Sequence, residues 1–117
     1  MQWFVAKIVY QIITGTGDHN PQFDEQLRLI SANTRDEAWK RASEIGVHEQ
    51  YAFRNQRQEL VEWRFISVPE VNVLDNLGDG MELYSRIEEP GDAKAYISWM
   101  QVKANHLKGQ HLLDVHA

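Results

Sequence analysis

The sequence contains no cysteine among its 117 residues, which excludes disulfide bonds, thiolate metal ligands and cysteine nucleophiles. It also has no long apolar run, since no window approaches the roughly 20 apolar residues that cross a bilayer. The first residues, Met1 to Lys7, lack the basic start and the long apolar stretch of a signal peptide. We therefore expect a cytoplasmic protein that is not embedded in a membrane.

Basic side chains are outnumbered, with 12 Lys and Arg against 17 Asp and Glu and a formal net charge of −5. This balance disfavours non-specific attraction to nucleic acid and to anionic membrane surfaces. Hydrophobic residues make up 43%, and the length suits one domain with its own core. We expect a single globular domain over residues 1–117, in which residues 110–117 form a loosely ordered tail.

Alternating apolar and polar side chains predict four strands. In the first, from Trp3 to Ile13, the even-numbered side chains are apolar throughout. Alternation resumes from Phe23, where we assign Phe23, Leu27 and Leu29 to the core, and again over residues 60–68 and 81–88. Residues 47–59 show no clear pattern.

Two helices are predicted from caps and apolar spacing. Thr34-Arg35-Asp36-Glu37 is a capping box, which places a helix from about Arg35 to Ile45 with Gly46 as its terminator. Asp92 is the expected N-cap of a second helix that ends at Gly109. The order ββαββα predicts an α+β fold, a mostly antiparallel sheet of about four strands with both helices on one face.

Several apolar stretches also carry a family resemblance. They are Trp3-Phe4-Val5-Ala6-Lys7, Phe23-Asp24-Glu25-Gln26, residues 34–46, Glu62-Trp63-Arg64-Phe65 and Gly80-Met81-Glu82-Leu83-Tyr84-Ser85-Arg86-Ile87. With its Trp-rich first strand and late Gly-x-Glu-x-Tyr-Ser stretch, the chain resembles small bacterial proteins grouped as a domain of unknown function. The resemblance covers roughly residues 1 to 105. It implies a compact bacterial domain and carries no catalytic residue.

If both helices cover one face of the sheet, the other face is open. Strand parity places Lys7, Gln11 and Ile66 there, with ten candidate interface residues: Trp3, Val5, Val9, Arg28, Ile30, Glu62, Arg64, Glu82, Tyr84 and Arg86. An apolar patch ringed by charge is typical of an interface. We therefore expect a non-enzymatic binding module that forms a homo-oligomer, such as a homodimer, or binds a bacterial partner protein. The alternative is that cross-strand pairs such as Arg64 with Glu82 only satisfy each other.

Catalytic and metal patterns are weak. His106, His111 and His116 are spaced by five, so on a helix each points about 140° from the last and the three do not converge. The Gly15-Thr16-Gly17-Asp18 loop precedes a strand rather than a helix, which indicates a hairpin rather than a phosphate site. We expect no metal and no cofactor.

Two other function classes stay open. A small hydrolase or ligand-binding enzyme would use an acidic and arginine pocket around Glu62, Arg64, Glu82 and Arg86. Nucleic acid is the weaker alternative, since aromatic and basic side chains mix near Tyr51, Phe53, Arg54, Arg57, Trp63 and Arg64. The sequence identifies no small-molecule ligand.

Overall fold

The computed structural model describes the backbone of residues 1–116 and the side chains of residues 1–109. The chain forms two compact units, Met1–Tyr84 and Ser85–Ala117. In chain order the elements are two strands, a helix, two strands and a helix, so the predicted α+β class and the order ββαββα are confirmed. Within the described residues, no helix combines the length and apolar character needed to span a membrane.

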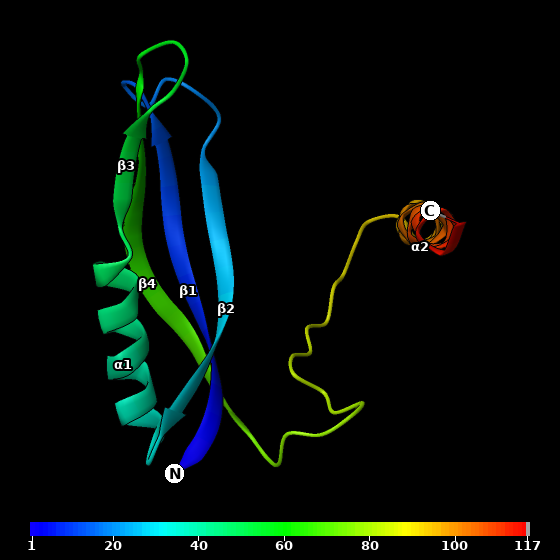
Figure 1. The fold of residues 1–117 in the computed structure, drawn as a ribbon, viewed down its shortest axis with the longest axis horizontal. Coiled ribbons are helices and arrows are strands. Elements are labelled where there is room, and N and C mark those ends of the chain that lie inside the picture. Colours follow the sequence, from blue (N-terminus) through cyan, green and yellow to red (C-terminus); the bar gives the residue numbers. More distant parts are fainter. Residues whose placement is uncertain (117) are drawn as a thin grey trace. The chain divides into compact units, whose positions relative to one another are not determined.

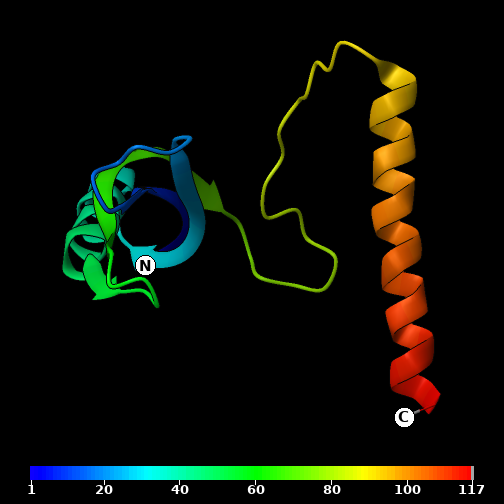
Figure 2. The ribbon, with the colours of Figure 1, turned by 90° about the horizontal axis from the view of Figure 1, so that it is seen from above.

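The first unit is built on a four-stranded antiparallel sheet in the order β2-β1-β4-β3. Its strands are β1 (Gln2–Thr14), β2 (Gln22–Ala32), β3 (Tyr51–Arg54) and β4 (Leu60–Leu74). Figure 1 shows β1 between β2 and β4, and Figure 2 looks along these strands. The central position of β1 explains why its even-numbered side chains Phe4, Ala6, Ile8 and Tyr10 are buried in the core, as the alternation predicts.

The helix α1 (Arg35–His48) follows β2 after a two-residue turn. Its predicted capping box is confirmed: the Thr34 hydroxyl accepts from the Glu37 amide at 3.2 Å. The Glu37 carboxylate accepts from the Asn33 amide at 3.0 Å. The first contact satisfies an amide that the first helical turn leaves unpaired, and the second ties Glu37 to the residue before the N-cap, so these side chains determine where α1 begins.

The prediction that Gly46 terminates this helix is wrong, because α1 continues to His48 and Gly46 is buried inside it. A Cβ atom at Gly46 would overlap Cε1 of Phe65 in β4. The glycine therefore permits the close approach of α1 to the sheet. The Tyr10 hydroxyl also donates to the Gly46 carbonyl at 2.9 Å, which satisfies an acceptor in the last helical turn.

The third and fourth strands differ from those predicted. Residues 81–88 contain no strand, although their side chains alternate. The strand that the sequence did not predict is β3, which pairs Tyr51 with Trp63 and Phe53 with Val61 of β4. Also, β4 runs through Pro69 to Leu74 with register irregularities opposite β1 between Lys7 and Tyr10. Alternation describes polarity only; a strand also needs a neighbour that pairs with its backbone.

The second unit contains α2 (Ala93–His116). Its predicted N-cap is confirmed, because Asp92 Oδ1 accepts from the Ala95 amide at 3.1 Å. The predicted end at Gly109 is wrong, since the helix continues to His116. That both helices cover one face, and that residues 1–117 form one domain, stay predictions; the side chains of residues 110–117 lie outside the described residues.

Candidate functional site

The two faces of the sheet differ because α1 covers only part of one of them. At 1.5 Å per residue the 14-residue α1 is about 21 Å long, whereas the 13-residue β1 spans about 43 Å. Figure 1 shows α1 beside the half of the sheet nearer the start of β1. One face is thus half covered, and the other carries no helix of this unit.

We call the second surface the helix-free face. It consists of the odd-numbered side chains of β1 and the side chains that lie beside them in the register: Trp3, Val5, Lys7 and Val9 in β1, Phe23, Glu25, Leu27 and Leu29 in β2, and Ser67, Glu70, Asn72 and Leu74 in β4. Trp3 is 40% exposed, Leu27 47% and Leu29 51%. Val5 is buried among these neighbours rather than beneath α1. The face therefore presents large apolar side chains to solvent.

A charged cluster lies at the centre of the helix-free face. The Lys7 side chain is buried, with its ammonium 3.7 Å from Glu25 Oε1 and 3.6 Å from Glu70 Oε2. It donates a hydrogen bond to the Tyr84 hydroxyl at 3.1 Å. This bond is the main cause that raises the pKa of Lys7, with smaller contributions from Glu70 and Glu25 against the opposing effect of burial. The ammonium therefore stays charged at the centre of the helix-free face.

The parity predicted for β2 is wrong. Ile30 lies opposite Phe4 and is 3% exposed in the core, and Arg28 lies opposite Ala6 on the α1 side. Phe23, Leu27 and Leu29 instead lie on the helix-free face. Alternation shows which residues share a face but not which face they take. The capping box at Thr34 could have predicted which side chains of β2 face the core. A helix that begins so soon after β2 packs over the Ile30 end of that strand.

The other predicted interface residues are divided between the two units. Glu62 and Arg64 lie opposite Ile13 and Gln11, on the helix-free side, and pair with each other at 2.7 Å. Tyr84 reaches the helix-free face from an irregular segment rather than from a strand. Glu82 belongs to the first unit, whereas Arg86 belongs to the second, where it pairs with Glu88.

Two hollows flank these residues. A cleft of about 560 Å³ adjoins the helix-free face, with Trp3, Leu74 and Leu77 among its lining residues. A shallower pocket of about 320 Å³ includes Glu62 and Arg64, next to the aromatic ring of Trp63. Because the two charged side chains neutralise each other, this pocket presents an ion pair rather than a free acid or base.

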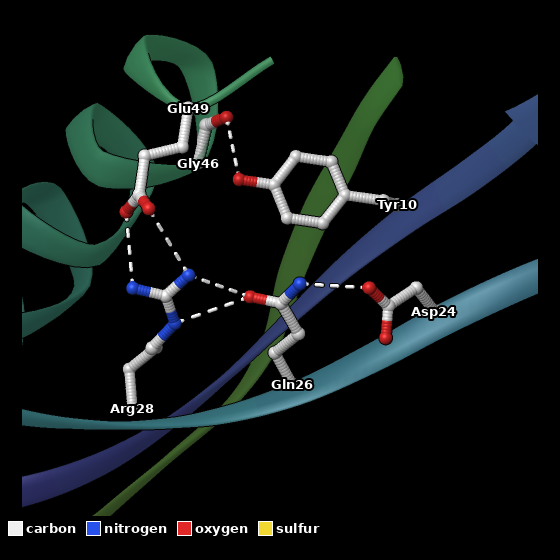
Figure 3. A network of polar contacts seen from close by, with 6 residues as sticks. All are labelled: Tyr10, Asp24, Gln26, Arg28, Gly46 and Glu49. Carbon is white, nitrogen blue, oxygen red and sulfur yellow. Dashed lines mark hydrogen bonds and ion pairs between the residues drawn. The ribbon is translucent and has the colours of Figure 1, made fainter. Parts of the chain in front are cut away.

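The uncovered half of the α1 side carries a polar network that the sequence did not indicate. Figure 3 shows Asp24, Gln26 and Arg28 in a row along β2, ending at Glu49 just after α1. Asp24 Oδ2 accepts from Gln26 Nε2 at 2.7 Å, Gln26 Oε1 accepts from Arg28 Nη2 at 2.7 Å, and Arg28 Nη1 donates to Glu49 Oε2 at 3.0 Å. The network ties β2 to the end of α1.

Aromatic rings lie beside this network. The ring centroids of Tyr51 and Trp63 are 5.0 Å apart, and Phe53 stacks on both. The Trp63 indole donates to Asp24 Oδ2 at 3.1 Å, which connects the rings to the polar row. Such mutual stacking occupies the faces of the rings, so we assign this cluster to the packing of the β3 edge.

The residues that the structure describes contain no group of three or more His, Cys, Asp or Glu side chains placed to hold a metal ion. The side chains of His111 and His116 lie outside the described residues. His19 is a structural residue, since its Nε2 accepts from the Thr14 amide at 3.0 Å in the β1–β2 loop.

No curated protein and no solved structure matches the chain. One protein family does, over residues 3–85, which coincide closely with the first unit. The chain belongs to this family, the Domain of unknown function (DUF4288).

Proposed function

We propose that the protein is a non-enzymatic binding module that docks another protein on its helix-free face. The exposure of Trp3, Leu27 and Leu29 on the side of the sheet without α1 is the observation that supports this most strongly. Large apolar side chains gathered on one surface are typical of protein interfaces. The partner we propose presents apolar side chains of its own to this surface.

The charged centre of the face supports docking of a specific partner. Lys7 already has its counter-charges in Glu25 and Glu70, so a partner covers it without having to neutralise it. The cleft beside Trp3 adds a recess that a side chain of the partner can enter. Together these features give the surface an apolar rim, a recess and a fixed polar centre.

In-cell photo-crosslinking tests this proposal. Trp3 is replaced by p-benzoylphenylalanine, and Tyr51, 51% exposed on the α1 side, is replaced in the matched control. We expect a discrete protein adduct from position 3 that is absent from position 51. The adduct should also disappear in the Leu29→Glu background. Adducts that are equal at both positions, or absent from position 3, contradict the proposal.

A further inference from the structure

The two edges of the sheet are protected differently. Beyond the short β3, the free edge of β4 is closed by side chains: Gln50 Oε1 accepts from the Phe65 amide at 2.9 Å, and Trp39 Nε1 donates to the Val68 carbonyl at 3.2 Å. Pro69 follows and has no amide hydrogen to offer. Proteins block exposed edges in this way because unpaired backbone groups recruit further strands.

The opposite edge, β2, has no such protection. The strand has 11 residues without proline or glycine. Within the described residues, no hydrogen bond other than those to β1 reaches the backbone of Gln22–Ala32. A strand of this length is twice the usual one, so the edge offers a long template for pairing.

The direction of the free backbone groups follows from the register. The Gly15 amide donates to the Leu60 carbonyl at 2.8 Å, so odd-numbered residues at this end of β1 pair with β4 and even-numbered ones face β2. The β1–β2 register runs unbroken from Gln2↔Ala32 to Ile12↔Gln22. The odd-numbered residues of β2 therefore direct their amides and carbonyls away from the sheet.

We propose that β2 pairs antiparallel with β2 of a second copy of this chain, about a two-fold axis at Gln26. In this register Asp24 lies opposite Arg28 of the second copy, and the reverse pair repeats across the axis. An axis at Glu25 would place two carboxylates together, and an axis at Leu27 would place Asp24 against Ile30. Of these three axes, the one at Gln26 pairs opposite charges, which favours a second copy of this chain in this register.

The same register joins the apolar residues of the helix-free faces. Phe23, which is 56% exposed, lies opposite Leu29 of the second copy, and Glu25 lies opposite Leu27. Asp24 uses Oδ2 for its bonds to Gln26 and Trp63, so within the described residues Oδ1 is left to accept from Arg28 of the second copy. The pairing forms one continuous sheet from two copies. It goes beyond the proposed docking function, because it rests on the edge rather than on the face.

Cysteine cross-linking tests the register, because the sequence has no cysteine of its own. In the proposed pairing position 26 faces itself, whereas the two copies of position 22 lie far apart along the strand. Gln26→Cys should therefore form a disulfide-linked dimer under mild oxidation, and the matched variant Gln22→Cys should not. Equal yields from both variants, or no linked dimer from Gln26→Cys, overturn the register and the pairing with it.

Hydrogen exchange separates this inference from the docking function. The amides of Glu25, Leu27 and Leu29 should be protected at concentrations where sedimentation shows a dimer, and should exchange rapidly on dilution. Leu27→Pro removes one outward amide and should give a monomer with the circular dichroism of the wild type. Free exchange of these amides in a dimer, or a monomer at every concentration, overturns the edge pairing. The docking function is tested separately, by photo-crosslinking from position 3.

Discussion

The ammonium group of Lys7 lies 3.1 Å from the hydroxyl group of Tyr84, 77 residues later in the chain. The same ammonium is 5.1 Å from the centroid of the Tyr84 ring, so both the hydroxyl and the ring face the charge. This contact fixes the irregular segment after β4 on the helix-free face. It also explains how the buried Lys7 side chain stays charged on this face.

Tyr84→Phe should lower the pKa of Lys7 towards its ordinary value of 10.5, because it removes the hydrogen bond that raises this pKa most. The charged Lys7 contributes stability that is fully present below pH 10.5 and is lost as the pH rises through the raised folded-state pKa. The variant should lose part of this contribution. Titration of the Lys7 Nζ signal by NMR measures the shift, and the exposed Glu82→Gln serves as control. An unchanged Lys7 pKa in Tyr84→Phe would refute the assignment.

Tyr10→Phe should destabilise the first unit by about 1–2 kcal/mol, since it leaves the Gly46 carbonyl without its buried donor. Burial also raises the pKa of Tyr10 above 10.0, so on a rise in pH the unfolded chain loses this proton first. The wild type should therefore lose stability above pH 10 through this group, and the variant should not. Urea unfolding at pH 7 and at pH 10.5 checks both effects. Tyr51→Phe, whose ring is half exposed, should change stability little at either pH.

Gly46→Ala should destabilise the protein by about 1–3 kcal/mol, because the new methyl group meets the Phe65 ring and forces α1 and β4 apart. Gly78→Ala is the matched control, since a Cβ atom there has no neighbour within 4 Å. Its unfolding free energy should stay within about 0.5 kcal/mol of the wild type. Equal effects of the two substitutions in chemical denaturation would mean that Gly46 is not a packing requirement.

Opening the β4 edge should change the size of the assembly. The double variant Trp39→Phe/Gln50→Ala removes both side-chain hydrogen bonds that close the edge beyond β3. With two free edges per copy, pairing no longer stops at a dimer, so sedimentation velocity should detect larger species. Trp99→Phe, which alters an exposed ring in α2, is the control for loss of an indole. A double variant that keeps the wild-type sedimentation coefficient would show that these side chains do not protect the edge.

The sequence predicted those features that local patterns determine. The even-numbered side chains of β1, the capping box at Thr34 and the cap at Asp92 are local in this sense, and the structure has each of them. These signals depend on residues within a few positions of one another. The fold class followed from their order along the chain.

The errors involve contacts between distant segments. Residues 81–88 alternate in polarity but form no strand, and the face taken by Leu27 and Leu29 depends on where α1 packs. Gly46 is required because the ring of Phe65, in the distant strand β4, leaves no room for a Cβ atom. Likewise, the row from Asp24 to Glu49 exists only because α1 ends beside the middle of β2. Periodicity along one strand contains none of this information.

Hydroxyl-radical footprinting in cells, compared with the dilute purified protein, tests the docking function most directly. We predict that oxidation of Trp3 and Leu29 falls in cells relative to the purified protein, because a protein partner covers the helix-free face. Oxidation of Tyr51 and Phe53, which are similarly exposed on the other side, should be unchanged. Oxidation of Trp3 and Leu29 at the same rate in both settings would contradict docking on the helix-free face.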